Sequence, residues 1–166
     1  MTLQKNYYKS PIGWIELASE NGALTAIVLT ELADDYEPAP TETTSEHPVL
    51  VAAARQLDEY FAGERREFDL PLAEARTAFR ADVLRRVRQV PFGETRSYRD
   101  IAVACGNSHA VRAVGGANGS NRLMIVVPCH RIVGADGSLT GYAGGLWRKE
   151  WLLRHEAQVT AGGQHA

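Results

Sequence analysis

The sequence Pro128-Cys129-His130-Arg131 places a thiol beside an imidazole, directly after the apolar, β-branched run 123–127, which predicts a buried strand. A thiolate is the reactive form of cysteine, and neighbouring His and Arg groups lower the thiol pKa from about 8.5, so Cys129 is a candidate nucleophile and His130 its candidate base. On an extended chain adjacent side chains point to opposite faces, which requires a bridging water between the two unless the chain bends. Pro128 fixes the backbone ahead of the thiol, as suits a preorganised site. The alternative is a buried structural cysteine beside a hydrogen-bonded histidine.

The other cysteine and histidine residues do not indicate a metal or disulfide framework. Cys105 and Cys129 are the only cysteines among 166 residues, which favours a reducing, cytoplasmic setting. Cys105, His109, Cys129 and His130 lack the paired spacing of structural zinc ligands. We therefore expect no metal, no cofactor and a cytoplasmic location.

Composition and charge are those of a folded protein with an asymmetric surface. Hydrophobic residues make up 45% and charged residues 23% of the chain, which argues against wholesale disorder. No apolar run approaches the roughly 20 residues of a membrane span, and the first five residues lack the apolar region of a secretory signal. Residues 1–75 carry a net charge of −9 and residues 76–155 a net charge of +8. This division favours a basic second half that faces a polyanion such as nucleic acid, the alternative being chance clustering of solvated charge.

The first 75 residues predict a small sheet with one helix. Alternating and apolar runs predict strands at 6–10, 14–18 and 24–29, and Asn21-Gly22 is a strong hairpin signal between the last two. A helix is expected from His47-Pro48 to Gly63, and 68–72 is a candidate edge strand because it contains Pro71. The acidic stretch 30–47 is expected to be a surface connection. We place the boundary between two lobes, 1–75 and 76–166, where the charge changes sign.

The second half predicts mostly helices. Thr77 is placed to cap a helix to 89 whose inward positions are Phe79, Val83, Leu84 and Val87, and Ser97 is placed to cap a helix over 98–104. A third helix is expected over 108–117 and a closing helix over 146–156, followed by a frayed tail to 166. The short glycine-containing turn at Gly106 between two helices, in a basic region, is typical of a helix-turn-helix, although an ordinary helical hairpin gives the same pattern.

The third of these helices carries unusually small side chains. Each interior glycine costs a helix about 1 kcal/mol relative to alanine, so the backbone is expected to approach something bulky. Tight packing against another helix and close approach of a nucleic-acid duplex both explain this. The small residues are Ala110, Ala113, Gly115, Gly116 and Ala117.

The motifs of the second half resemble those of the O6-alkylguanine-DNA alkyltransferases. The active-site sequence 128–131 is joined, in the family's order and at its spacings, by 91–95, 97–98, 112–118, 141–145 and 146–156. The resemblance implies an α+β fold, in which a small ribonuclease H-like sheet-plus-helix lobe packs on a mostly helical lobe with a helix-turn-helix. It also implies a cofactor-free, single-use protein that repairs DNA by moving an alkyl group from guanine O6, or from thymine O4, to its own cysteine.

The resemblance assigns catalytic roles to five residues. Cys129 would be the acceptor, His130 would take its proton through a water, and Glu156 would orient and stabilise the histidine. Asn121 would close the turn ahead of the active-site strand and hydrogen-bond near the cysteine. Tyr98 would donate to the guanine ring as negative charge develops on it.

The resemblance also implies how damaged double-stranded DNA would bind to a monomer of this chain. Arg112 would replace an extruded nucleotide in the base stack, since a buried thiol cannot reach a stacked base. The small helix would lie in the minor groove through Ala110, Ala113 and Gly115. Further DNA contacts are expected from Arg122 and Arg131. The base pocket would be lined by Val127, Pro128, Tyr142, Ala143, Gly144 and Gly145.

Two departures from the family pattern and three rival functions remain. Arg122 stands where many members have proline, and Ala143 stands where some have a hydroxyl.

An alkyltransferase-like protein that binds damage without efficient transfer is the main alternative, and Cys129 argues against it because that class lacks the acceptor. A Cys-His hydrolase would leave the basic half and Arg112 unexplained. A purely structural interpretation would leave Gly115-Gly116 and the basic half unexplained.

Overall fold

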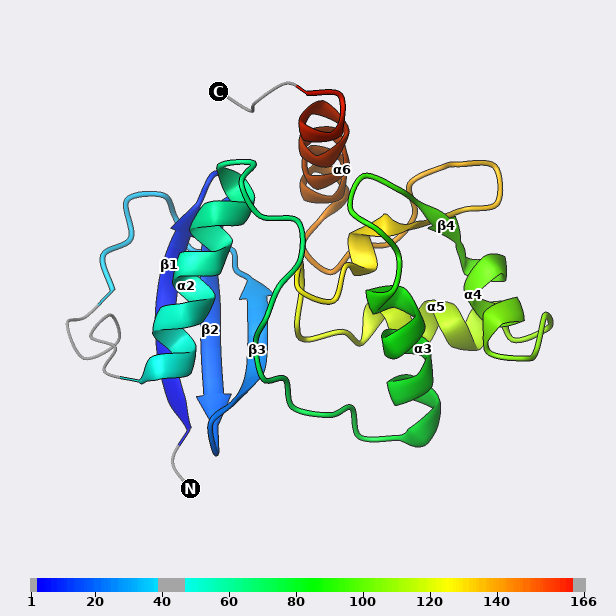
Figure 1. Ribbon diagram of the computed structural model, residues 1–166, viewed down its shortest axis with the longest axis horizontal. Helices are drawn as coiled ribbons and strands as arrows, with labels where there is room; N and C mark the ends of the chain where they lie inside the picture. Colours follow the sequence, from blue (N-terminus) through cyan, green and yellow to red (C-terminus); the bar gives the residue numbers. More distant parts are fainter. Residues whose placement is uncertain (1–2, 39–46, 163–166) are drawn as a thin grey trace.

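The computed structural model describes residues 3–38 and 47–162. A sheet-plus-helix lobe lies beside a mostly helical lobe, and the last helix, α6 (Leu146–Thr160), lies above the junction between them (Figure 1). The predicted α+β arrangement is confirmed. The predicted surface connection 30–47 falls in part, at 39–46, outside the described residues, as does the end of the predicted frayed tail.

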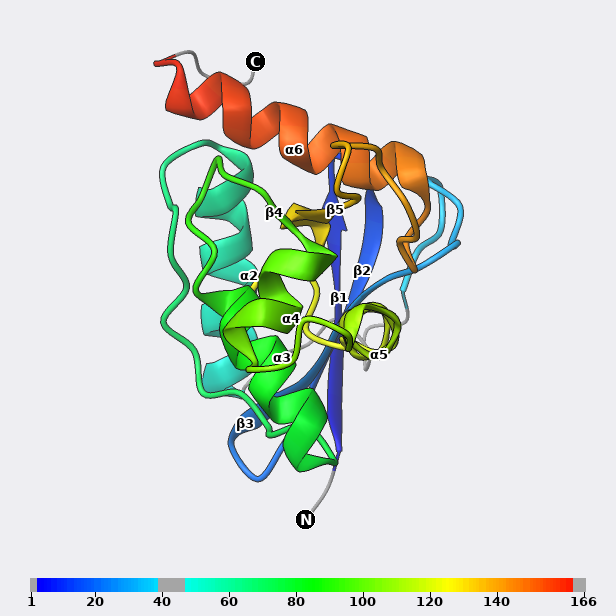
Figure 2. The same ribbon diagram turned by 90° about the vertical axis from the view of Figure 1, so that its right-hand side faces the viewer.

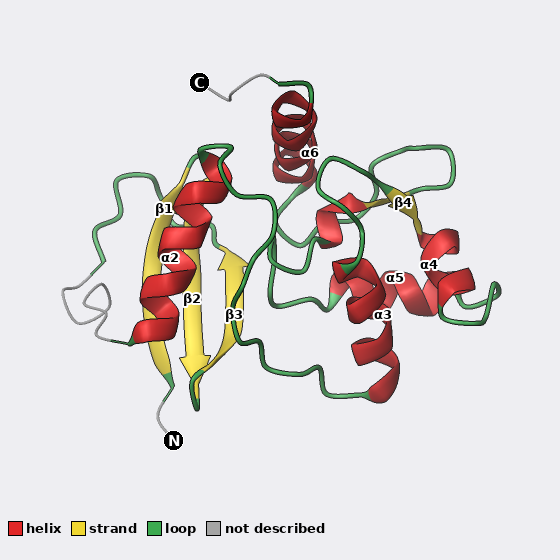
Figure 3. Ribbon diagram, in the orientation of Figure 1, coloured by secondary structure: helices red, strands yellow, loops and turns green. Residues whose placement is uncertain are grey.

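The N-terminal lobe is an antiparallel meander covered on one face by a helix (Figure 3). Its strands β1 (Gln4–Ser10), β2 (Gly13–Glu20) and β3 (Ala23–Leu29) pair in sequence order. Asn21 and Gly22 both have positive φ, of 55° and 79°, so the predicted two-residue hairpin is confirmed with the turn geometry that suits the twist of the strands.

Helix α2 (Pro48–Phe61) confirms the predicted helix of this lobe. Pro48 begins it, where its missing N–H has no intrahelical partner to lose. Its buried side chains Leu50, Leu57 and Tyr60 face the core, which continues into the second lobe. The helix therefore carries side chains toward both lobes, Tyr60 among them.

Two segments predicted as strands do not form ladders. In 68–72 only Leu72 forms a bridge, which joins it to Leu24. Pro71 has no N–H to donate, so it contacts the sheet only through its carbonyl, which accepts from the Leu24 amide at 2.8 Å. In 123–127 the backbone turns back at Ile125, whose φ is 74°, leaving single bridges from Leu123 to Ile27 and from Met124 to Val127. The active-site sequence therefore follows a tight buried turn.

The helices of the C-terminal lobe form with adjusted bounds. Thr77 caps α3 (Ala78–Arg88) and Ser97 caps α4 (Tyr98–Ala104) with a capping box, as predicted. Helix α5 (Val111–Gly119) begins and ends later than predicted, and α6 continues to Thr160, so the expected fraying from 157 is wrong for its first four residues. Phe79 is 41% exposed rather than inward, because it lies at the start of α3, outside the core that holds Val83 and Val87.

A two-residue parallel pair, which the sequence analysis missed, joins this lobe's helices to the active-site turn. Strand β4 (Arg96–Ser97) pairs with β5 (Ile132–Val133). Figure 2 shows this pair beneath α6, with α4 leading away from it. Tyr98, the first residue of α4, directly follows this pair, which holds it beside the segment that carries His130. No helix among residues 3–38 and 47–162 is long and apolar enough to cross a membrane.

Arg148 fastens the two lobes together from the first turn of α6. Its buried guanidinium donates to the carbonyls of Ile12 at 2.8 Å, Thr30 at 2.9 Å and Gly144 at 3.0 Å, and pairs with Glu31 at 3.0 Å. A planar group with five N–H donors can serve carbonyls of both lobes at once.

We expect Arg148→Met to lower the free energy of unfolding by about 3 kcal/mol, because buried carbonyls lose their donors. Arg154→Met is the matched control, since Arg154 is an exposed partner of Glu150 on the same helix and should change stability by less than about 1 kcal/mol. Urea unfolding of both variants measures the difference. An equal loss of unfolding free energy in both variants would contradict the proposed role of Arg148 in holding the two lobes together.

Candidate active site

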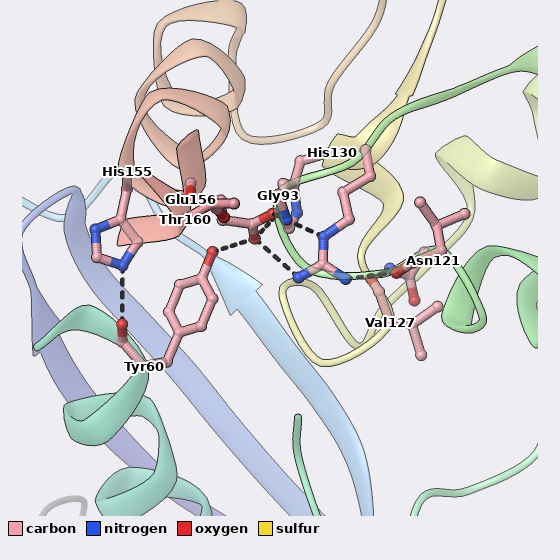
Figure 4. A network of polar contacts seen from close by, with 10 residues as sticks. Tyr60, Gly93, Asn121, Val127, His130, His155, Glu156 and Thr160 are labelled. Atoms are coloured by element: carbon pink, nitrogen blue, oxygen red, sulfur yellow. Dashed lines mark hydrogen bonds and ion pairs between the residues drawn. The ribbon is translucent and has the colours of Figure 1, made fainter. Parts of the chain in front are cut away.

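The carboxylate of Glu156 is the centre of a buried polar network (Figure 4). Its Oε1 accepts from the Gly93 amide at 3.1 Å and from Arg131 Nε at 2.8 Å. Its Oε2 lies 2.6 Å from the Tyr60 hydroxyl, 2.7 Å from His130 Nε2 and 2.9 Å from Arg131 Nη2. Burial acts to raise the pKa of Glu156, but the hydrogen bond of His130 together with the hydrogen bonds and charge of Arg131 outweighs it and holds that pKa well below its usual range. Glu156 is therefore an ionised carboxylate.

His130 is arranged as a neutral base. Burial lowers its pKa, against the opposing effect of Glu156, so the resting imidazole is uncharged. Because Oε2 of an ionised carboxylate can only accept, Nε2 carries the ring proton. Nδ1 is buried and has no hydrogen-bond partner within the described residues, which leaves its lone pair available for a proton.

Cys129 begins a single 3₁₀ turn, η1 (Cys129–Arg131), rather than an extended stretch. The expectation that neighbouring side chains point to opposite faces does not apply there, because the chain bends at Pro128, whose ψ is 65°. The Cys129 amide donates to the Val127 carbonyl at 2.8 Å, and its carbonyl accepts from Asn118 Nδ2 at 3.3 Å. The residue is 5% exposed. Its backbone is thus fixed on both sides.

The thiol of Cys129 is protonated at rest. Burial raises its pKa, and the side chain of Asn121 and the positive charge of Lys149 oppose this only in part. The expectation that His130 and Arg131 lower this pKa is wrong, because burial dominates and Arg131 is committed to Glu156. Reaction at this sulfur therefore needs an acceptor for its proton.

Asn121 holds the turn that precedes the cysteine. Its Nδ2 donates to the Val127 carbonyl at 2.8 Å, and its Oδ1 accepts from the Leu123 amide at 2.9 Å. The side chain also hydrogen-bonds to Cys129. It thus lies where the sequence placed it, between the turn and the sulfur.

Lys149 is a buried cation that no motif in the sequence marks as part of the site. Its Nζ donates to the carbonyls of Ile132 at 2.6 Å and Thr140 at 2.9 Å, and it lies 5.9 Å from the centroid of the Tyr98 ring. Burial lowers its pKa, against the attraction of a Cys129 thiolate. The Tyr98 hydroxyl donates to the same Thr140 carbonyl at 3.1 Å. Lys149 and Tyr98 therefore form one polar group beside the cysteine.

The segment 142–145 closes over the site from the start of α6. The Tyr142 hydroxyl is buried without a hydrogen-bond partner in the described residues, and its charge interaction with Cys129 places it near the sulfur. A Cβ at Gly144 would lie 2.7 Å from Leu29 Cδ1, so a larger residue there would have to displace the Leu29 side chain. Gly145 has a φ of 94° and begins α6. Ala143 is exposed, whereas Val127 and Pro128 are buried beside the thiol.

Ala113, Gly115 and Gly116 of α5 face open space, whereas Ala117 is buried in the core. A Cβ added at Gly115 would meet only a Tyr98 carbon at 4.0 Å, and a Cβ added at Gly116 would meet nothing within 4 Å. Internal packing therefore does not require these glycines, which leaves the approach of an external partner as their explanation. Arg112 and Ala113 are exposed on the same helix, and Arg112 forms no ion pair with any residue of 3–38 or 47–162. Ala110, half-buried, precedes its first turn.

Two arginines predicted to contact DNA lie in different surroundings. Arg131 is 5% exposed, with its guanidinium bound to Glu156 and to the Val90 carbonyl at 2.7 Å, so its predicted DNA contact is contradicted. Arg122 is exposed and shares a hollow with Arg76 and Arg80 beside the sheet.

Comparison with known proteins agrees with the arrangement of the two lobes. Residues 3–73 match the family described as 6-O-methylguanine DNA methyltransferase, ribonuclease-like domain, and residues 78–158 match its DNA binding domain. The chain is 47% identical to the methylated-DNA–protein-cysteine methyltransferase of Mycolicibacterium paratuberculosis, over 89% of this chain and 88% of the relative. It is 45% identical to the constitutive methylated-DNA–protein-cysteine methyltransferase of Bacillus subtilis, over 91% and 95%. The crystal structure of Mycobacterium tuberculosis OGT in complex with DNA superposes with a TM-score of 0.82 at 42% identity, covering 94% of both chains.

Proposed function

This chain belongs to the family of the methylated-DNA–protein-cysteine methyltransferases, and on that premise we propose that it repairs O6-alkylguanine in double-stranded DNA by irreversible transfer of the alkyl group to Cys129. The observation that supports this most is a buried Cys129 thiol followed in the chain by a neutral His130, whose Nδ1 is unpartnered within the described residues and whose Nε2 lies 2.7 Å from the ionised Glu156. That order of groups moves a proton away from sulfur.

The transfer balances as a displacement at carbon. The Cys129 sulfur forms a bond to the alkyl carbon as the bond from that carbon to guanine O6 breaks. The thiol proton passes, through a water, to His130 Nδ1, and Glu156 stabilises the resulting imidazolium. Tyr98 hydrogen-bonds to the base as negative charge develops on it, and the base then takes up one proton from solvent while the His130 imidazolium releases one, so the protons balance. The product is a thioether and an intact guanine, and no cofactor takes part.

The single use of the protein follows from the product. A thioether is not a leaving group under mild conditions, and regenerating the thiol would require a further reactant. Each molecule therefore repairs one lesion. We also propose that the protein acts as a cytoplasmic monomer, with residues 1–75 as a ribonuclease-like lobe and 76–166 as the lobe that binds DNA and transfers the alkyl group.

DNA binding is assigned to the exposed face of α5. Ala110, Ala113 and Gly115 let a minor groove approach the helix, and Arg112 replaces the base that is flipped out. The base then enters beside the 142–145 segment, next to Val127 and Pro128. Because Cys129 is 5% exposed, the base has to displace side chains around the thiol, Tyr142 first among them. Arg122 is proposed to contact phosphate.

The test is the mass of the intact protein after incubation with a duplex that contains O6-methylguanine. We expect the addition of one methyl group, located on the peptide that contains Cys129, and no addition to Cys129→Ala. Cys105→Ala is the matched control, since Cys105 is the other free cysteine and lies at the end of α4, and it should react like the wild type. A methyl group that persists in Cys129→Ala, or no addition to the wild type, would contradict the proposal.

A further inference from the structure

Tyr60 reaches the active site from the opposite lobe. It is fully buried at the end of α2, and its hydroxyl donates to Glu156 Oε2 at 2.6 Å. Its backbone carbonyl accepts from His155 Nε2 at 2.8 Å. One residue of the ribonuclease-like lobe thus binds two consecutive residues of α6, and Figure 4 shows both contacts.

The oxygen that Tyr60 binds is the one that faces His130. Oε2 also accepts from His130 Nε2 and from Arg131 Nη2, so Tyr60 supplies one of three donors to this atom. Arg131 already balances the charge of Glu156, and a protonated His130 would give the group a net positive charge. Burial raises the pKa of Tyr60 well above its ordinary value, so Tyr60 remains a neutral donor throughout.

We propose that Tyr60 is a positioning residue for alkyl transfer: its hydroxyl holds Glu156 Oε2 against His130 Nε2 and draws off part of that oxygen's negative charge. The inference rests on the proposed function, because it concerns the same proton path. It gives the N-terminal lobe a positioning role in alkyl transfer, beyond supporting the fold.

The direction of the effect follows from the groups around His130. Glu156 and Lys149 face it from α6, Tyr60 acts on Glu156 from α2, and Cys129 and Arg131 flank it in η1. Loss of the Tyr60 hydroxyl leaves Oε2 more negative, which stabilises protonated His130 and raises its pKa. His130 then becomes protonated at a higher pH than in the wild type. Because only neutral His130 can accept the thiol proton, the acidic limb of the pH–rate profile moves to higher pH.

Tyr60→Phe tests this with the ring retained among its aromatic neighbours Phe61, Phe68 and Phe92. In single-turnover methyl transfer we expect the acidic limb to move up by about 0.5–1 pH unit and the plateau rate to fall about three- to tenfold. Tyr8→Phe is the matched control, because Tyr8 donates to Asp58 of the same helix at 2.6 Å, away from Glu156. It should leave both quantities unchanged.

A second substitution keeps the test decisive if Tyr60→Phe folds poorly. Incorporating 3-fluorotyrosine at position 60 makes the phenol a stronger donor without removing it, and the acidic limb should then move to lower pH. An unchanged limb in both variants would overturn the proposal and leave Tyr60 a packing residue. Failure of the wild type to transfer at any pH would instead contradict the proposed function, so the two failures are distinct.

Discussion

Glu156→Gln is expected to slow methyl transfer by about 10²- to 10⁴-fold and to lower the free energy of unfolding by about 3–5 kcal/mol. The rate falls because an amide neither stabilises the imidazolium nor enforces the tautomer that leaves Nδ1 free. Stability falls because Arg131 is left as a buried charge without a counterion. Quench-flow transfer to a methylated duplex and urea unfolding measure the two effects.

Two further variants separate chemistry from stability. Glu150→Gln, on the same helix, removes only an exposed ion pair with Arg154 and should change neither quantity appreciably. The double variant Glu156→Gln with Arg131→Met removes both buried charges, and we expect it to regain stability while remaining slow in transfer. If the double variant also regained the rate, Glu156 would have only a structural role.

The candidate catalytic residues Cys129 and His130 were predictable from a short motif, whereas Asn121, Glu156 and Tyr98 were identified only through the resemblance to the alkyltransferases. Cys129 and His130 are adjacent in the sequence, Asn121 closes a local turn, and Glu156 lies on a helix whose start Gly145 marks. Local capping residues such as Thr77 and Ser97 also specified their helices correctly, since a cap depends on contacts within four residues.

The remaining features depend on contacts between distant parts of the chain. Tyr60 lies 96 positions from Glu156, and only the packing of α2 beneath α6 joins them. The sequence does not show which charges are buried. Lys149 was therefore not predicted as part of the site, and the DNA contact predicted for Arg131 was wrong. The predicted strand at 123–127 failed for a related reason: its apolar residues indicate burial, but the turn at Ile125 decides the conformation.

The role of α5 gives the second large expected effect. We expect Arg112→Ala to slow repair of O6-methylguanine in a duplex by about 30- to 100-fold and to slow reaction with the free alkylated base by less than about twofold. Extruding a nucleotide costs a few kcal/mol of stacking, and only the duplex substrate requires a side chain that replaces it. Arg112 is exposed and unpaired within the described residues, so its loss should leave the fold intact.

The comparison of substrates isolates base flipping from general attraction to DNA. Arg55→Ala is the matched control, since it removes one exposed positive charge from α2 in the other lobe and should affect both substrates little. A single strand that carries the lesion should be less sensitive to Arg112→Ala than the duplex, because its base is already partly unstacked. Equal slowing on duplex and free base would mean that Arg112 acts on the chemical step or on the pocket, and the exposed glycines of α5 would then need another partner.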